Sequence, residues 1–535
     1  PMRPMILFSA VLLAPLLLAA QERLAISPAA AQQKFDRVFR YLNNIYVDEV
    51  DMAPLAEEAI RAMLAELDPH SAYLTAEEMK ASAEIFDGEF SGIGIEFNIL
   101  RDTLLVVNTV AGGPAERVGM QPNDRIVRID TLPAAGIARA DVPKLLRGRT
   151  GTSVDLEVVR RGEPAPLRFS VVRDRIPLNT VDAAYLAADR TGYIKVNRFG
   201  RTTMDEFRAA FASLGGLDAL ILDLRGNGGG LLDQAVELAG FFLPRGAVVV
   251  STEGRAVPSV AYRNPSDGDF AEGPLAVLID ESSASGSEIV AGAVQDWDRG
   301  VVIGRPSFGK GLVQRQFPLP DGSAVRITVA RYHTPSGRVI QRPYEKGKRE
   351  DYYLEHLRRY GTAPDTLAAD APVYHTLRTG RTVYGGGGIV PDLFVAADTT
   401  RITPYLMQLV RRGVLNEYTL LYLDRHRREL ARAYPTFEAY ASGFAVTDAM
   451  LDELAALGEA RGIARAEEEL SVSAPLLRLR LRAVVAQKLF DATAFCRIFN
   501  DTDNVPYSLA LEVLAAWPQK GAPLLEKGKL DGVNL

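Results

Sequence analysis

The sequence predicts a multidomain α/β protein with flanking helical segments, and three patterns lead to this fold class. Between residues 177 and 395, short apolar runs typical of buried strands alternate with segments of helical spacing. Between residues 89 and 172, the pattern changes to short strands separated by turn residues. Apolar residues recur at helical spacing on both sides of these regions. The predicted parts are residues 1–31, 32–88, 89–175, 176–397 and 398–535.

The composition is that of a globular protein with several domains: 535 residues, 47% of them hydrophobic, and a formal net charge of −6. The chain has no long basic run, so nothing in it indicates a nucleic-acid partner. Its one cysteine, Cys496, has no partner for an intrachain disulfide and lies in an apolar helical context. We expect Cys496 to be a small buried residue without a redox role.

A short positive region and an apolar core open the chain. Arg3 is followed by apolar residues 5–20, which end in small side chains as a secretory signal does. This core is shorter than a usual membrane span, so a signal segment over residues 1–31 is favoured and an uncleaved signal anchor is the alternative. We therefore expect an exported protein that is periplasmic or associated with the cell envelope.

Residues 32–88 are expected to form two or three helices, because their apolar residues follow helical spacing. The pair Asp68-Pro69 interrupts this pattern and is followed by His70. His70 is a candidate base. A histidine that anchors a turn through hydrogen bonds is the favoured interpretation.

The central feature of the 176–397 part is a serine-rich turn between a strand and a helix. Residues 275–280 form an apolar run bounded by turn residues, which predicts a buried strand. A turn at the carboxyl end of such a strand is exposed to substrate. Four serines follow within it, at positions 282, 283, 285 and 287. The simpler interpretation is that they cap the next helix, since Ser is a favoured N-cap and Glu288 suits a first helical turn.

Two further features favour chemistry over capping. Lys310 lies in a Gly-flanked loop directly after another predicted strand, and a lysine in an apolar pocket loses proton affinity and serves as a general base. A Gly-rich turn over residues 226–230 also follows a predicted strand. Its backbone N–H groups are suited to hold an oxyanion.

These residues resemble the catalytic core of the C-terminal processing peptidases, serine proteases of family S41 with a Ser-Lys dyad and a PDZ domain. Residues 283–288, Ser-Ala-Ser-Gly-Ser-Glu, fit the nucleophile motif of that family with Ser285 in the middle. Residues 308–314 fit its Phe-Gly-Lys-Gly-x-Val-Gln motif, with Lys310 at the usual spacing from the nucleophile. The resemblance implies a spiral ββα core of the ClpP/crotonase type, and no metal or organic cofactor.

The resemblance also assigns roles to further residues. It implies that Gln314 orients the lysine and that Asp296 is a supporting acidic residue. In the predicted mechanism, the N–H groups of Gly229 and Gly286 stabilise the oxyanion. The chain departs from the family pattern at two positions. Gly286 stands where Ala is usual and Gly228 where Pro is usual, and both changes keep a small residue.

Residues 89–175 resemble an inserted PDZ domain. Residues 113–124 and 146–152 match its helix and turn hallmarks. The loop formed by Gly92, Ile93, Gly94 and Ile95 is similar to the carboxylate-binding loop, whose successive N–H groups capture a terminal carboxylate while an edge strand pairs with the peptide. The resemblance further implies that Arg147 helps to hold the active arrangement.

The 398–535 part is rich in Leu, Ala, Arg and Glu at helical spacing. Within it, residues 476–489 alternate arginine with leucine. The solvated face of a packed helix is the favoured interpretation, and a partner-binding or membrane-surface helix is the alternative. Homo-oligomer formation through the helical segments and peripheral membrane contact therefore stay open.

Together these features predict a secreted or periplasmic serine endopeptidase. Its PDZ-like domain would recognise the free apolar C-termini of protein or peptide substrates, Ser285 would attack the scissile carbonyl and neutral Lys310 would take the proton. The alternative from another class is a non-catalytic, PDZ-bearing adaptor that binds such tails. A penicillin-binding enzyme is suggested by Ser307 and Lys310 as Ser-x-x-Lys, but neither Ser-Asp-Asn nor Lys-Thr-Gly occurs in the chain.

Overall fold

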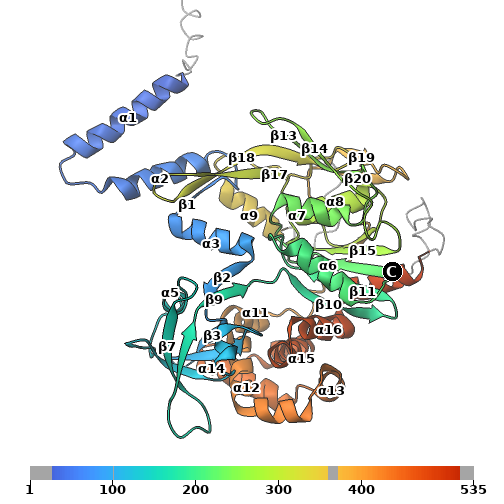
Figure 1. Ribbon diagram of the computed structural model, residues 1–535. Coiled ribbons are helices and arrows are strands. Elements are labelled where there is room, and N and C mark those ends of the chain that lie inside the picture. The colour runs from blue at the N-terminus through green and yellow to red at the C-terminus, as the bar shows by residue number, and fades with distance from the viewer. Residues whose placement is uncertain (1–26, 101, 359–370, 518–535) are drawn as a thin grey trace, which may run out of the picture. The chain divides into compact units, whose positions relative to one another are not determined.

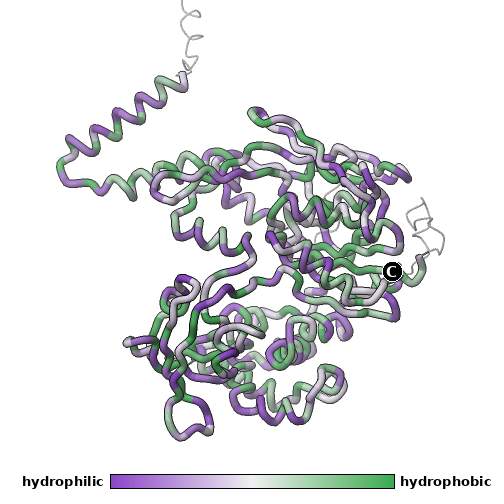
Figure 2. The backbone as a smooth tube through the Cα atoms, in the orientation of Figure 1, coloured by the Kyte–Doolittle hydropathy of each residue, from purple (hydrophilic) through white to green (hydrophobic). Residues whose placement is uncertain are grey.

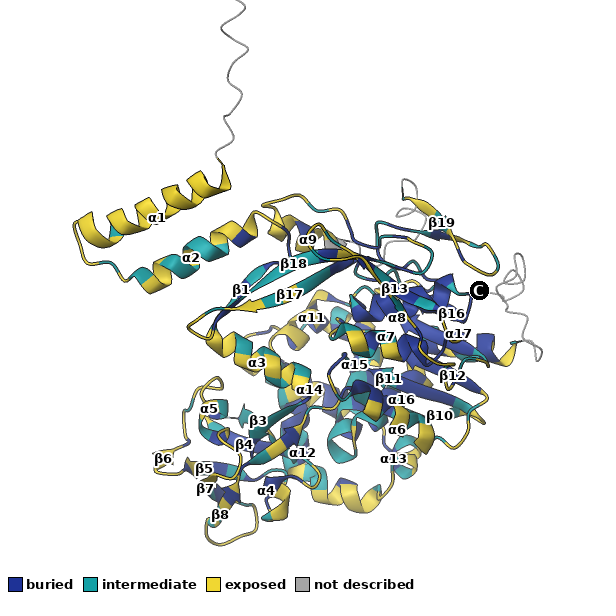
Figure 3. Cartoon of the chain, turned by 45° about the horizontal axis from the view of Figure 1, so that its top comes forward, coloured by how far each residue is buried: buried dark blue, intermediate teal, exposed yellow. Residues whose placement is uncertain are grey.

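The computed structural model describes residues 27–100, 102–358 and 371–517, and the chain divides into two compact units, residues 1–64 and 65–535. Most of the predicted signal segment therefore lies outside the described residues. Helix α1 (Pro28–Ile45) begins at an N-cap, Ser27, so the predicted boundary at residue 31 falls inside this helix. With α2 (Met52–Ala65) it forms most of the described part of the first unit, and the side chains of α1 are largely exposed (Figure 3). No helix within the described ranges is long and apolar enough to cross a membrane.

A six-stranded sheet forms the centre of the second unit, with the strand order β10-β11-β12-β15-β16-β21 (Figure 1). The first pair is antiparallel and the other neighbours are parallel. The central strands of the parallel part, β12, β15 and β16, are buried along their whole length and largely apolar, as expected for strands covered on both faces (Figure 2). Their bounds are β10 Val181–Ala188, β11 Thr191–Val196, β12 Ala219–Asp223, β15 Leu275–Ile279, β16 Val301–Gly304 and β21 Leu393–Phe394.

Helices cover both faces of this sheet. On one face, α6 (Thr203–Ser213), α7 (Leu232–Gly240) and α8 (Gly286–Asp296) contribute to a core with Leu222, Val277 and Val302. On the other face, α16 (Ala492–Asp503) and α17 (Val505–Ala515) pack against the remaining strand residues. The predicted boundary at residue 398 thus separates these last two helices from the sheet that they cover. Cys496 is buried in this second core, as predicted.

A second sheet lies beside the first and carries a long strand, β18 (Ala324–His333). One partner of β18 is β17 (Leu312–Pro318). Its other partners are β1 (Ala72–Leu74) and β13 (Val248–Glu253), and β14 (Val260–Arg263) completes the sheet. Helix α3 (Ala76–Asp87) follows β1, and α9 (Arg349–Arg358) follows β18 with a hairpin of β19 (Val373–His375) and β20 (Thr382–Tyr384) further on.

Residues 89–177 form the predicted β-rich insertion. Its ends pair as β2 (Glu89–Gly92) and β9 (Asp174–Pro177). The sheet inside has the order β3-β4-β5-β7-β8, so β3 is an edge strand, and β6 pairs with β5. The further bounds are β3 Ile95–Leu100, β4 Thr103–Thr109, β5 Arg125–Ile129, β6 Leu132–Pro133, β7 Ser153–Val159 and β8 Leu167–Val172, with helices α4 Pro114–Arg117 and α5 Val142–Leu146.

The other helices after residue 398 have a core of their own. They are α11 Pro404–Arg411, α12 Val414–Ala433, α13 Phe437–Gly443, α14 Asp448–Ala460 and α15 Glu467–Leu489. In α15 the leucines of the alternating segment, such as Leu477 and Leu481, are fully buried in that core. This supports the packed-helix interpretation of residues 476–489.

Candidate active site

The site lies where several strands of the central sheet end. Strands β12 and β15 are parallel neighbours, so the turns after them meet at the same edge of the sheet. Ala284 N donates to Asn227 O at 3.0 Å, and Phe199 N donates to Gly229 O at 3.1 Å. The Gly-rich turn is thereby held against the serine-rich turn, as the sequence predicted.

The backbone at Ser285 is strained. Its φ is 56° and its ψ is −109°, whereas an N-cap residue is normally extended. The other non-glycine residues with positive φ in the described chain are all Asp or Asn, which tolerate this region more easily. A serine on a sharp turn between a strand and a helix is the geometry of a nucleophile elbow.

The neighbouring serines have structural contacts instead. Ser283 Oγ donates to Leu224 O and Ser287 Oγ donates to Asn227 O, each at 2.8 Å, and both residues are buried. Ser282 is exposed. Of the four serines, only Ser285 lines the central cavity.

Glu288 joins the nucleophile turn to the lysine loop. This fully buried carboxylate accepts hydrogen bonds from Ser285 N at 2.8 Å and Lys310 N at 2.9 Å. Its other oxygen accepts from Gly309 N at 2.6 Å and Ser307 Oγ at 2.5 Å. Burial raises the pKa of Glu288. Sequence reasoning assigned this residue only to a first helical turn and so missed that it fixes both catalytic candidates.

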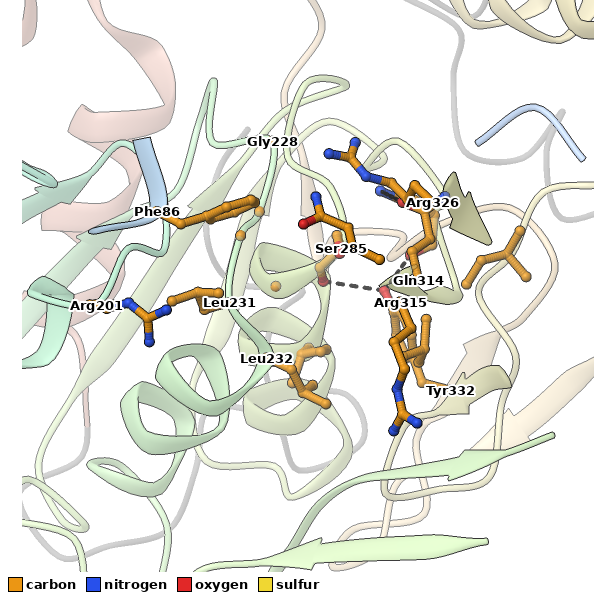
Figure 4. A pocket seen from close by; sticks show the side chains of 18 of the residues that line it. Phe86, Arg201, Gly228, Leu231, Leu232, Ser285, Gln314, Arg315, Arg326 and Tyr332 are labelled. Carbon is orange, nitrogen blue, oxygen red and sulfur yellow. Dashed lines mark hydrogen bonds between the residues drawn. The ribbon is translucent and has the colours of Figure 1, made fainter. Parts of the chain in front are cut away.

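Tyr332 makes a second link between the same two residues. Its hydroxyl lies 3.2 Å from Ser285 O and 2.5 Å from Lys310 O, and it donates to these carbonyls. Figure 4 shows Tyr332 and Ser285 facing each other in the cavity. The pKa of Tyr332 is raised well above its ordinary value by burial, so it remains a donor. The sequence gave no signal for this role beyond the position of Tyr332 in a strand.

The Lys310 ammonium donates to Gln314 Oε1 at 3.2 Å, and in the described structure it makes no hydrogen bond to Ser285. This is the contact that the predicted orienting role of Gln314 requires. The other amide atom of Gln314, Nε2, is buried without a partner. Catalytic hydrogen bonds are often long before substrate binds, so the absence of a Ser285 contact is compatible with the predicted dyad.

The pKa of Lys310 is lowered, first by burial and then by the nearby positive charge of Arg326. Glu288 and Asp68 act in the opposite direction and are weaker. A lowered pKa increases the fraction of neutral amine, which is the form that accepts a proton.

Ser285 and Lys310 line one cavity of about 670 Å³ (Figure 4). Its walls come from the Gly-rich turn, the start of α7 and α8, strands β17 and β18, and helix α3. Apolar side chains such as Met79, Phe86 and Leu232 alternate with Arg201, Arg315 and Arg326.

The two predicted oxyanion donors differ in this structure. Gly286 is the first residue of α8, so its N–H lies at a helix N-terminus that favours negative charge. The N–H of Gly229 instead donates to Asn227 Oδ1 at 2.8 Å. The prediction that the Gly229 N–H is an oxyanion donor is therefore wrong for this structure, because that N–H already donates to the Asn227 side chain. Gly229 must nevertheless be glycine, because a Cβ would lie 2.7 Å from Ser285 Cβ.

Asp296 and His333 lie outside the cavity lining. The Asp296 carboxylate accepts from Arg338 at 2.6 Å and from Ser336 N at 2.9 Å, and both charged side chains are buried. Asp296 thus holds a loop at the far end of α8. His333 Nδ1 lies 3.3 Å from Gly337 O in a local turn.

His70 is held by aromatic rings rather than by the turn contacts expected for its side chain. Its ring packs against Phe308, Tyr352 and Tyr353, and its Nε2 is buried without a hydrogen-bond partner. Burial, followed by the charge of Lys310, lowers its pKa to about 4. The anchoring contacts expected of His70 come instead from Asp68, whose Oδ1 accepts from His70 N at 2.9 Å.

In the insertion, the predicted carboxylate-loop residues Gly92 and Ile95 end β2 and begin β3, and Ile93 and Gly94 connect these strands. Gly94 has a φ of 74°, and Val110 N donates to Gly94 O at 2.9 Å. Ile93 is 2% exposed and belongs to the core of the insertion, so its side chain is not available to contact a substrate side chain. Ile95 is half-buried at the start of the edge strand β3.

Arg147 ends helix α5 and reaches helix α3. Its guanidinium lies 2.5 Å from Glu84 Oε2 and 4.3 Å from the centre of the Phe90 ring. Because α3 also lines the catalytic cavity, Arg147 connects the insertion to a wall of the site.

Four family models match the chain. Peptidase family S41 matches residues 190–353 and the PDZ domain matches residues 105–160. The model described as the activating protease CtpB N-terminal domain matches residues 18–78, and a family of unknown function matches residues 405–491.

Curated relatives give the same family. The carboxy-terminal-processing protease of Bartonella bacilliformis is 39% identical over 315 residues, which cover 58% of this chain and 72% of the relative. A probable CtpA-like serine protease of Staphylococcus aureus is 35% identical over 326 residues, or 60% of this chain and 64% of the relative.

The chain is also similar to the solved photosystem II D1 C-terminal processing protease, with 26% identity, 69% of this chain and 94% of that chain covered, and a TM-score of 0.35. It is similar to the PDZ domain of a Vibrio cholerae carboxy-terminal protease solved with a peptide, with 31% identity, 17% of this chain and 99% of that chain covered, and a TM-score of 0.16. From the family match and the Bartonella relative together, the chain belongs to peptidase family S41, as a peptidase with a PDZ domain.

Proposed function

We propose that this peptidase is an endopeptidase that cleaves with a Ser285-Lys310 dyad. One observation carries the proposal: a serine on a strained turn and a lysine of lowered pKa line the same cavity, and the buried Glu288 carboxylate holds both backbones. Activation of a serine requires an adjacent base that is neutral at working pH. Burial lowers the pKa of Lys310 and so increases its neutral fraction.

The geometry supports an acyl-enzyme mechanism. Ser285 Oγ bonds to the scissile carbonyl carbon while its proton passes to Lys310 Nζ. The resulting oxyanion is stabilised by the Gly286 N–H at the start of α8. Breakage of the C–N bond returns the proton to the leaving amine, and water then hydrolyses the Ser285 ester. The chemistry needs no metal or organic cofactor.

The PDZ domain is proposed to bind the free C-terminus of a protein substrate. Edge strand β3 offers backbone groups for pairing with an extended tail, and the loop before it offers N–H groups to a carboxylate. Half-buried Ile95 favours an apolar last residue. A tail held there would raise the effective concentration of the scissile bond at Ser285.

The contact of Arg147 with Glu84 supports a role of that arginine in holding the active arrangement, because the contact joins the PDZ domain to α3. We further propose that the catalytic core follows the spiral ββα arrangement and that the protein acts outside the cytoplasm. The apolar core after Arg3 supports export.

Cleavage of matched peptides tests both parts of the proposal. Peptides that end in a free apolar residue should be cleaved roughly ten- to a hundredfold faster than the same peptides amidated, since amidation removes charge-assisted hydrogen bonds. Ser285→Ala should abolish cleavage of both. If Ser285→Ala binds free tails but the wild-type protein cleaves none, the adaptor alternative replaces the peptidase proposal. If amidation changes nothing, the tail-reading role is withdrawn and the dyad remains.

A further inference from the structure

Arg326 projects into the catalytic cavity from strand β18 (Figure 4). Both Arg326 and Tyr332 of this strand line the cavity, and the charge of Arg326 acts on Lys310. Tyr332 contacts the backbones of Ser285 and Lys310. Arg326 is thus directed to the part of the cavity where the scissile bond would lie.

The guanidinium of Arg326 has no ion pair or hydrogen bond within the part of the chain that the structure describes. Arg201, another arginine of the cavity, is paired with Asp87 at 2.6 Å. The two acidic groups that act to raise the pKa of Lys310 already accept other hydrogen bonds. Glu288 accepts four hydrogen bonds, and Asp68 accepts from Ser71 Oγ at 2.5 Å and from Thr328 Oγ1 at 3.1 Å.

Burial of an arginine without an anion is unfavourable. Arg326 is half-buried, and burial lowers its pKa. A carboxylate that entered the cavity would restore the lost solvation with charge-assisted, bidentate hydrogen bonds. The cavity contains Arg315 as a further cation, whereas the only acidic residue among its described lining residues is Asp87, which Arg201 already neutralises.

We propose that Arg326 is a specificity-determining residue that binds a carboxylate of the substrate next to the scissile bond. The carboxylate comes from an Asp or Glu side chain, or from the terminal carboxylate of a peptide that ends close to the cleavage site. This preference is separate from the recognition of a tail by the PDZ domain, but it rests on the proposed peptidase function.

The same contact would change how Lys310 titrates. Arg326 lowers the pKa of Lys310, while Glu288 and Asp68 raise it, and His70 on the other side is neutral above about pH 4. A substrate carboxylate paired with Arg326 offsets the positive charge near Lys310. In a plot of kcat against pH, the acid limb should therefore lie at higher pH for an acidic substrate than for its neutral analogue.

The test uses the full-length protein and one cleavable peptide in which each position flanking the cleavage site is Glu or Gln in turn. A second pair of short peptides ends near the cleavage site with a free or an amidated terminus. In the wild-type protein we expect one Glu position, or the free short terminus, to raise kcat/KM about tenfold. In Arg326→Gln the ratio of kcat/KM between the acidic peptide and its neutral partner should fall below about twofold. The acid limb of kcat against pH should then be the same for both peptides.

Arg331→Gln is the matched control, because Arg331 is an exposed arginine of the same strand that does not line the cavity. It should keep the wild-type ratio. Arg326→Lys keeps the charge without the bidentate fork and should retain part of the preference, which preserves the test if the Gln variant does not fold.

The inference is overturned if the wild-type protein does not distinguish the paired peptides, or if Arg326→Gln keeps the wild-type ratio and pH profile. In those cases continued cleavage that depends on Ser285 leaves the proposed function intact. Loss of all dependence on Ser285 would instead contradict the proposed function itself.

Discussion

The substitution Glu288→Gln removes the charge that holds the catalytic turn and loop together. The carboxylate accepts two hydrogen bonds at each oxygen. An amide keeps one oxygen, which we expect to stay with Ser285 N and Lys310 N, while its NH₂ group faces Ser307 Oγ and Gly309 N. The serine hydroxyl can rotate to accept, but the Gly309 N–H would meet another donor.

The cost follows from these contacts. One charge-assisted bond is lost at about 1.5–3 kcal/mol, and the remaining bonds become neutral, so we expect a loss of about 2–4 kcal/mol in the free energy of unfolding. Under conditions where the variant is fully folded, its rate of peptide hydrolysis should still be lower than that of the wild-type protein, because Lys310 loses part of its fixed position. Urea unfolding and peptide hydrolysis measure the two effects.

Glu237→Gln serves as the control, since Glu237 is an exposed carboxylate paired with Arg208. The substitution Glu237→Gln should lower the free energy of unfolding by less than about 1 kcal/mol. Glu288→Gln with wild-type stability and wild-type activity would show that the carboxylate does not position the dyad.

Three further changes test other parts of the account. Gly286→Ala, which restores the residue usual in the family, places a Cβ 2.9 Å from the buried Phe199 ring and should cost about 1–3 kcal/mol in urea unfolding; an unchanged midpoint would contradict the packing argument. His70→Phe should remove a pH-dependent loss of stability. The folded-state pKa of His70 is about 4 against 6.5 for the free side chain, so the wild-type protein should lose at most about 3 kcal/mol as pH falls from 6.5 to 4, and a parallel loss in the variant would rule out His70 as the cause. Arg147→Ala breaks a partly exposed ion pair and should change thermal stability by less than about 1 kcal/mol, yet lower the rate of tail-dependent cleavage; equal rates for variant and wild type would remove Arg147 from the coupling.

The sequence predicted the elements that bear local patterns. The serine-rich turn, the Gly-rich turn and the lysine loop each follow an apolar strand. Because these strands are parallel, their carboxyl ends lie at one edge of the sheet. The approach of these three segments was therefore predictable before their geometry was known. The role of each of the predicted site residues in catalysis stays a prediction.

The contacts that organise the site were not predictable in the same way. Glu288 has the local signature of a helix first turn, and only the fold brings Gly309 and Lys310 to its oxygens. The free N–H of Gly229 was inferred from its turn, but the side chain of Asn227 occupies it. The packing of α16 and α17 on the central sheet depends on contacts across most of the chain, which helical periodicity does not reveal.

Labelling by a fluorophosphonate, with the adduct located by mass spectrometry, tests the Ser285-Lys310 dyad most directly. The account predicts one adduct, on Ser285, with a labelling rate that rises with pH as Lys310 loses its proton. Lys310→Ala should reduce this rate by orders of magnitude while the protein remains folded. An adduct on another residue, or a Lys310→Ala variant that is labelled at the wild-type rate, would contradict the assignment.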